Sequence, residues 1–156
     1  MKSILTTSIL SLVVTHLTFS QWFWQNPLPQ GNFLTCVDLV DENVGWAIGY
    51  TGTILRTTNG GANWISQASG TTNNLNSISF TDANNGTAVG VAGTILRTTN
   101  GGETWTLQTS GTTEDLNGVS FSDPNNGIAV GDQYGGYYGT ILQTTDGGTS
   151  WTSQTS

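Results

Sequence analysis

The feature that most constrains the fold is a motif that occurs three times within 156 residues. The motif reads GTILRTTNGGANW from Gly52, GTILRTTNGGETW from Gly93 and GTILQTTDGGTSW from Gly139. Each copy follows a second motif, which is LTCVDLVDENVGWAIG from Leu34 in the first unit and recurs from Leu75 and Leu116. Self-similarity at a period of about 41 residues indicates stacked supersecondary units that share one continuous core.

Each unit is predicted to form four short strands. In the middle copy the strands are expected at residues 75–80, 87–91, 94–98 and 105–108, with turns at 82–86 and 100–102. Ile95 and Leu96 are adjacent apolar residues, so we expect the third strand to be covered on both faces. Four-stranded sheets that repeat radially are typical of a β-propeller. We therefore predict an all-β fold of three four-stranded antiparallel blades, at residues 34–74, 75–115 and 116–156.

The turn between the third and fourth strands has the same residue types in every copy. Its repeated residues are Thr57, Asn59, Gly61 and Trp64, then Thr98, Asn100, Gly102 and Trp105, then Thr144, Asp146, Gly148 and Trp151. An Asn or Asp oxygen accepts backbone N–H groups across its own turn, Gly permits a positive φ, and Trp buries a large ring beside the hairpin. We assign these residues a structural role.

These turns resemble the Asp-box of sialidases and BNR-repeat propellers, with Asn59 and Asn100 in place of the usual Asp. Over nearly all of residues 22–156, the TTNGG or TTDGG turn, the GTIL strand and the downstream Trp resemble the photosystem II stability/assembly factor family. The resemblance implies a propeller that assists the assembly of a membrane complex, with relatives among secreted bacterial proteins. The arginine-lined patch of photosynthetic members has no counterpart here, so that function is not carried over.

The N-terminus differs from the repeats. Residues 1–20 combine Lys2, a short apolar stretch and small residues before Gln21, which is the pattern of a secretory signal peptide. An uncleaved membrane anchor is the alternative, and His16 with the scattered hydroxyl groups disfavours it. We expect a secreted, periplasmic or cell-surface protein with no membrane insertion after cleavage. Residues 21–33 are expected to form the outer strand that closes the ring and its linker, because Trp22 parallels Trp64.

Charge excludes several classes of partner and chemistry. After signal removal Arg56 and Arg97 are the only cationic side chains, against 10 Asp and Glu, so a nucleic-acid partner is not expected. Without His16 no His-dependent triad or His metal site is possible, and we expect no cofactor, no metal and no catalytic residues. A sialidase-like site needs an arginine triad, whereas Arg56 and Arg97 share one repeat position with Gln143 and are interpreted as blade residues.

Other candidate groups are interpreted as structural. The pairs Asp41-Glu42 and Glu114-Asp115 fall in predicted turns or linkers, where solvated charge is the ordinary case. The segments DANNG and DPNNG lack the spacing of a calcium loop and are expected to be hairpin turns. Cys36, the lone thiol, shares its repeat position with Ser77 and Gly118, which suggests a small buried slot; a bridge between chains is the alternative.

The repeat is interrupted once, by an insertion between the second and third strands of the last unit. It contains Asp132, Tyr134, Tyr137 and Tyr138 with flexible Gly, and it is the first candidate for a binding loop. Loops at this place in a propeller share a face with the connections between blades. A tolerated loop insertion is the alternative interpretation.

Three units do not close a propeller, which needs at least about four blades. We expect both end blades to expose an apolar face, with the ring completed by further blades in a longer chain, which is favoured, or by oligomerisation. The expected function is a non-enzymatic secreted scaffold for protein interaction or assembly. The alternatives are a carbohydrate-binding propeller, in which the Tyr loop with Trp22 or Trp24 stacks on sugars, and a fragment of a sialidase-like hydrolase whose catalytic residues lie on other blades.

Overall fold

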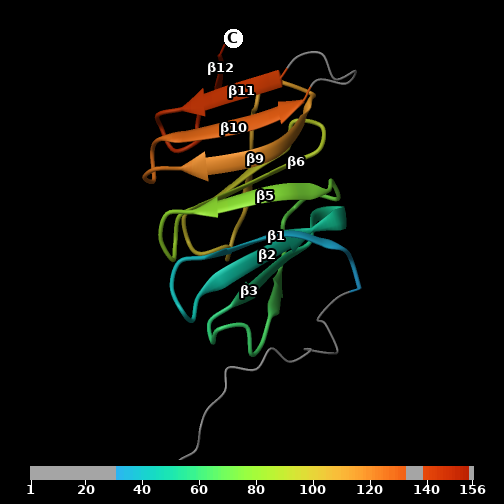
Figure 1. The fold of residues 1–156 in the computed structure, drawn as a ribbon, viewed down its shortest axis with the longest axis vertical. Coiled ribbons are helices and arrows are strands. Elements are labelled where there is room, and N and C mark those ends of the chain that lie inside the picture. The colour runs from blue at the N-terminus through green and yellow to red at the C-terminus, as the bar shows by residue number, and fades with distance from the viewer. Residues whose placement is uncertain (1–30, 133–138, 155–156) are drawn as a thin grey trace, which may run out of the picture.

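Three antiparallel sheets are stacked one on the next along the longest axis of the molecule (Figure 1). The computed structural model describes residues 31–132 and 139–154. Within them the chain forms three four-stranded sheets, each with its strands in sequence order. The predicted propeller-blade architecture is therefore confirmed. The predicted signal peptide (1–20) and most of the predicted closing segment (21–33) lie outside the described residues.

Each sheet is one blade. Blade 1 contains β1 (Leu34–Leu39), β2 (Gly45–Gly49), β3 (Ile54–Thr57) and β4 (Ile65–Gln67), with the 3-10 turn η1 (Tyr50–Gly52) between β2 and β3. Blade 2 contains β5 (Leu75–Phe80), β6 (Gly86–Gly90), β7 (Ile95–Thr98) and β8 (Thr106–Gln108). Blade 3 contains β9 (Asp115–Phe121), β10 (Gly127–Asp132), β11 (Gly139–Thr144) and β12 (Thr152–Ser153). Among the described residues no helix is long and apolar enough to cross a membrane.

The first strands of the blades, β1, β5 and β9, lie next to one another, with β5 between the other two (Figure 1). The predicted strand at 75–80 is observed as β5, and the predicted strand at 87–91 begins and ends one residue earlier as β6. Equivalent strands also keep the same register, since Leu34 pairs with Gly49 in blade 1 and Leu75 pairs with Gly90 in blade 2. The sequence repeat is thus a structural repeat.

The core lies between the blades, and the adjacent apolar residues of β3 and β7 are buried on both faces of their strands. Ile95 and Leu96 in β7 are 0% and 1% exposed, as the adjacent apolar residues predicted. In blade 3 the equivalent residues differ, because Leu142 is 2% exposed while Ile141 is 38% exposed. The difference arises because Leu142 packs against blade 2, whereas no blade within the described residues covers the opposite side of blade 3.

Two faces of the molecule are defined by its loops. The loop face carries the linkers between blades and the loops between second and third strands, and it lies on the right in Figure 1. The turn face, on the opposite side, carries the hairpin turns that join the first to the second strand and the third to the fourth. β10 ends at Asp132 on the loop face, and the rest of the predicted binding loop, at 133–138, lies outside the described residues.

Candidate interaction surfaces

The repeated turn residues form a small hydrogen-bonded unit at each turn between third and fourth strands. In blade 1 the Thr57 hydroxyl accepts a hydrogen bond from the Gly61 N–H at 2.9 Å, and the Asn59 side-chain oxygen accepts one from the Asn63 N–H at 2.8 Å. Gly61 has a φ of 83°, which favours glycine. The same pattern recurs around Thr98 and Asn100 and around Thr144 and Asp146. The Thr and Asn or Asp side chains of each repeated turn therefore form hydrogen bonds within that turn.

The Trp of each repeated turn connects the turn to its blade. Trp105 and Trp151 are half-buried and pack edge-on against Phe80 and Phe121, with ring centroids 5.9 and 6.0 Å apart. Trp64 is also half-buried, and it lines a cavity on the outer side of blade 1. The rings thereby link the peripheral turns of blades 2 and 3 to their first strands.

Asp146 is the carboxylate at the position that Asn59 and Asn100 occupy in the other two repeated turns. It accepts hydrogen bonds from the Ser150 hydroxyl, the Ser150 N–H and the Thr144 hydroxyl, which together lower its pKa from 3.8 to about 2. Because the pKa is lower in the folded state, this carboxylate stabilises the fold above about pH 4. The stabilisation is lost as the pH falls toward 2.

We expect the stability of the Asp146→Asn variant to change less with pH in the acid range than that of the unchanged protein. The variant has the amide found at Asn59 and Asn100, so its turn retains the acceptor oxygen but no longer titrates. Melting temperatures of both proteins, measured between pH 7 and pH 2, should differ most at neutral pH and converge near pH 2. A difference that stays constant over this range would contradict the assignment.

Three of the acidic residues named as alternative catalytic or calcium groups, Asp41, Asp82 and Asp123, accept hydrogen bonds from nearby backbone N–H groups. The Asp41 carboxylate accepts hydrogen bonds from the Asn43 and Val44 N–H groups, which lower its pKa. Asp82 and Asp123 cap the DANNG and DPNNG turns in the same way, and their pKa values are lowered mainly by the side chains of Asn85 and Asn126. No cluster of three or more His, Cys, Asp or Glu suited to a metal occurs in residues 31–132 and 139–154.

Arg97 lies at the interface of blades 2 and 3. Its guanidinium donates a hydrogen bond to the Pro124 carbonyl at 3.0 Å and lies over the Phe121 ring at 5.5 Å, and burial lowers its pKa. Arg56 occupies the equivalent position in blade 1 and lies over the Trp46 ring at 5.6 Å. The structure thus places both arginines between blades, one on each interface, rather than together in one pocket.

Hydrogen bonds tie the loops of the loop face in blades 1 and 2 to the start of the next blade. The Thr51 N–H donates to the Asn74 side chain at 3.0 Å, and the Ala92 N–H donates to the Asp115 carboxylate at 2.8 Å. In blade 3 the Asn117 side chain donates to Asp132, the first residue of the predicted binding loop. Asp132 is exposed at the end of β10, whereas Tyr134, Tyr137 and Tyr138 lie outside the described residues.

A groove of about 710 Å³ crosses the loop face of blade 2. Its walls come from the linker before β5, the loop between β6 and β7, and the segment from β8 to the next linker. The lining side chains are mostly hydroxyl groups, and no charged residue lines the groove. Leu107, which is 67% exposed, supplies its largest apolar contact.

The groove was not among the sites expected from the sequence. Its residues come from three separate segments, so no compact motif marks it. One signal exists, because Leu107 is an exposed aliphatic residue at a repeat position where the other units have Ser66 and Ser153. A departure from the repeat that adds apolar surface is a sequence signal for such a site.

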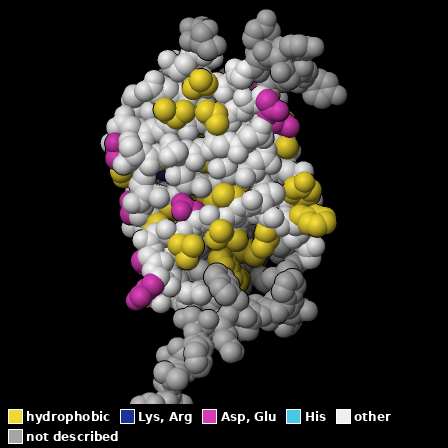
Figure 2. Space-filling model, viewed as in Figure 1, with side chains coloured by type: hydrophobic (Ala, Val, Ile, Leu, Met, Phe, Trp, Pro, Cys, Tyr) yellow, Lys and Arg dark blue, Asp and Glu magenta, His cyan; other side chains and the backbone are white. Residues whose placement is uncertain are grey.

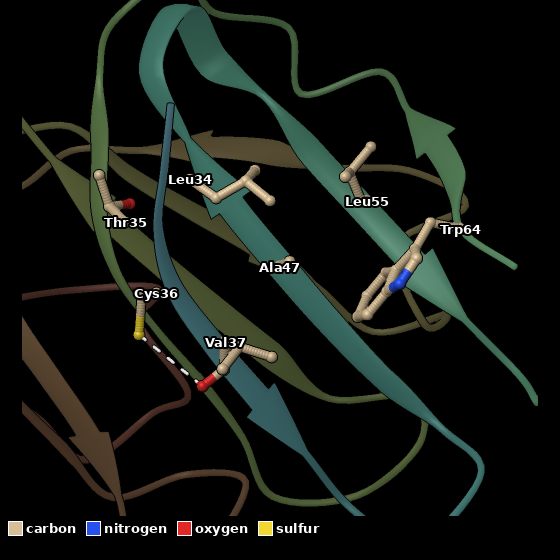
Figure 3. A pocket seen from close by; sticks show the side chains of 7 residues that line it. All are labelled: Leu34, Thr35, Cys36, Val37, Ala47, Leu55 and Trp64. Atoms are coloured by element: carbon tan, nitrogen blue, oxygen red, sulfur yellow. Dashed lines mark hydrogen bonds between the residues drawn. The ribbon is translucent and has the colours of Figure 1, made fainter. Parts of the chain in front are cut away.

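The outer side of blade 1 carries a separate, apolar cavity of about 410 Å³ (Figure 3). The labelled side chains of Leu34 and Val37 come from β1, Ala47 from β2 and Leu55 from β3, and Trp64 approaches from the other side. Cys36 is half-buried and is not in a disulfide, and it packs against the core between blades 1 and 2. The site of Cys36, predicted to be a small buried slot, is therefore only partly enclosed.

Stacked four-stranded sheets with their core between the sheets define the class of protein as a β-propeller, of which three blades are described. A family model described as "Photosynthesis system II assembly factor YCF48" matches residues 15–107. The chain belongs to this family. No match was found among the curated proteins.

Two solved structures support the same fold. One, described as "YCF48 bound to D1 peptide", superposes with a TM-score of 0.70 at 23% identity, covering 81% of this chain and 40% of the other. The second, YCF48 from Cyanidioschyzon merolae, has a TM-score of 0.68 at 25% identity and covers 81% and 41% of the two chains. The chain thus spans about two fifths of the length of these propellers.

Proposed function

We propose that this protein is an exported, non-enzymatic propeller module that binds a segment of another protein in the groove on the loop face of blade 2. Membership of an assembly-factor family supports a role in protein interaction, and one solved relative holds a peptide of D1. The pattern of residues 1–20 supports export. The single observation that carries the proposal is the shape and chemistry of the groove itself.

The groove suits an extended, uncharged polypeptide. Its hydroxyl groups are held in place, since the Asn73 amide donates to the Thr94 hydroxyl at 2.8 Å and the Ser110 hydroxyl donates to the Thr112 carbonyl at 3.0 Å. A rigid polar wall offers hydrogen bonds to a peptide backbone at low entropic cost. Leu107 then provides an apolar contact for one side chain of the ligand. The acidic surface as a whole favours segments without negative charge.

A random peptide library displayed on phage tests the proposal with a defined probe. We expect the purified protein to enrich extended peptides, and Leu107→Asp to weaken binding of a synthesised enriched peptide by about tenfold or more, measured by fluorescence anisotropy. Ile65→Asp is the matched control, because Ile65 is a 69% exposed aliphatic residue on the outer strand of blade 1 and lies outside the groove. This control should bind with unchanged affinity.

Two other outcomes would replace the proposal. Enrichment of no peptide, together with binding on a glycan array that Leu107→Asp removes, would assign the groove to carbohydrate. Turnover of fluorogenic glycosides by the purified protein would favour the hydrolase alternative. Equal weakening by Leu107→Asp and Ile65→Asp would show that peptide binding lies elsewhere.

A further inference from the structure

A separate polar pocket of about 420 Å³ opens between blades 2 and 3. Its walls include the turn between β9 and β10 and the turns that join the third to the fourth strand in both blades. The pocket therefore belongs to the turn face, whereas the groove described above crosses the loop face. Arg97 and Asp146 are the charged residues in its lining, and the other side chains are mainly hydroxyl and amide groups.

The pocket arises from a change in the repeat between one blade interface and the next. At the interface of blades 1 and 2, three positions hold apolar residues, which are Val44, Trp46 and Ile65. The equivalent positions at the interface of blades 2 and 3 are polar, and they hold Asn85, Thr87 and Thr106. Trp46 is fully buried at the first interface. Replacing this indole by the small Thr87 leaves space at the second interface, and polar groups surround that space.

The same change leaves a backbone carbonyl without side-chain partners. At the first interface the Gly101 carbonyl accepts hydrogen bonds from the Trp46 indole and the Gln67 amide, each at 3.2 Å. Gly147 is the equivalent residue in blade 3, where it is half-buried and lines the pocket. Within the described residues no side chain donates to its carbonyl. Gln108, the equivalent of Gln67, donates to a carbonyl of its own strand instead. The Gly147 carbonyl can therefore accept a hydrogen bond from a ligand.

Both charged groups of the pocket already have partners in the protein. The Arg97 guanidinium donates to the Thr87 hydroxyl at 3.3 Å and to the Pro124 carbonyl at 3.0 Å. The Asp146 carboxylate accepts hydrogen bonds within its own turn. Each group thus keeps only part of its hydrogen-bonding capacity for a ligand. Several acidic side chains lie along the turn face, on the left in Figure 2, and disfavour an anionic ligand.

We propose that this pocket binds a sugar unit of a neutral carbohydrate. A sugar hydroxyl both donates and accepts hydrogen bonds, so it can donate to the Gly147 carbonyl and accept from Arg97 or from a threonine hydroxyl. Part of the wall is already fixed, because the Asn100 amide donates to the Thr104 hydroxyl at 3.0 Å. A fixed polar wall lowers the entropic cost of binding. The volume of the pocket lies in the usual range for small-molecule sites.

A glycan array with neutral and acidic members, probed with the purified full chain, tests the proposal. We expect binding to neutral members, and the strongest of them is then titrated by calorimetry against two variants. Thr106→Ile restores the apolar residue of blade 1, and Gln108→Ala removes an amide from the wall. Each variant should bind at least about tenfold more weakly, because hydroxyl groups of the sugar lose their partners. Both residues lie on β8, the edge strand of blade 2, so the circular dichroism spectrum should be unchanged.

Ile65→Thr and Gln154→Ala are the matched controls. Ile65 and Gln154 occupy the repeat positions of Thr106 and Gln108 on blades 1 and 3, and they lie outside the pocket. Both controls should bind the glycan with unchanged affinity. Equal weakening by a variant and its control would show that the loss does not come from the pocket, and the proposal would be wrong.

Other results would also overturn it. Unchanged glycan affinity in both Thr106→Ile and Gln108→Ala would place the sugar elsewhere, and loss in Leu107→Asp alone would place it in the loop-face groove. A preference for acidic members of the array would make Arg97 the centre of an anion site. If no glycan binds, and Thr106→Ile weakens binding of a peptide enriched from the phage library, the pocket belongs to a protein partner. Binding of neither ligand would leave the pocket without a role in recognition.

Discussion

Replacing Trp46 by alanine is expected to lower the free energy of unfolding by about 3–5 kcal/mol. The ring is fully buried between blades 1 and 2, stacked on Phe80 with centroids 3.5 Å apart. Its Nε1 donates a hydrogen bond to the Gly101 carbonyl at 3.2 Å, and Arg56 lies over its other side. Truncation leaves a cavity at the interface of two blades. It also removes one of the two side-chain hydrogen bonds that the Gly101 carbonyl accepts, the other coming from Gln67.

The control is Ile128→Ala, because Ile128 occupies the same repeat position in β10 of blade 3 and is 49% exposed. We expect this change to cost less than about 1 kcal/mol. Urea unfolding followed by far-UV circular dichroism measures both variants. Similar losses for the two variants would show that the interface between blades 1 and 2 contributes little to stability.

Gly93→Ala is the second substitution with a large expected effect, a loss of about 3 kcal/mol or more. Gly93 has a φ of +65°, and a Cβ there would lie 2.1 Å from the Thr112 carbonyl oxygen. Its N–H donates to the Glu114 carbonyl at 2.8 Å, so the loop has no freedom to move away without losing a contact with the linker. Because Gly93 also lines the groove of the loop face, the change should weaken peptide binding as well.

Gly111→Ala separates backbone strain from the steric clash. Gly111 has a φ of +76° and lines the same groove, but a Cβ there would meet nothing within 4 Å. Only the cost of a left-handed conformation remains, about 1 kcal/mol. Thermal and urea unfolding of the two variants side by side should show the larger loss for Gly93→Ala. Equal losses would mean that the loop relaxes around the added methyl group.

Much of the fold was predictable because it depends on short-range information repeated three times. The alternation of apolar residues in LNSISF and the turn residues that follow it predict β5 at its observed bounds. Turn chemistry is equally local, since the Asn59 oxygen and the Thr57 hydroxyl act only on the next few backbone N–H groups. Small errors occurred at strand ends, where β7 begins at Ile95 rather than at residue 94.

The candidate site was much less predictable. The sequence directed attention to the insertion after Asp132, whereas the groove described here is assembled from linkers and loops of blades 1 and 2. Its hydroxyl groups appear unremarkable in the sequence because similar residues recur in each repeat. Leu107 departs from its repeat position by adding a large apolar side chain, and its exposure becomes meaningful once the loops around it are in place.

The sequence by itself determined the strands, the tight turns, the number of units and the scarcity of cationic groups, because each of these depends on a residue and its near neighbours. Only the tertiary structure decided that Trp46 stacks on Phe80, that Arg97 reaches Pro124 and Phe121, and which two faces stay open. Those contacts join residues of different repeats. They depend on which face of one sheet packs against which face of the next sheet. Repetition within a sequence does not specify that packing.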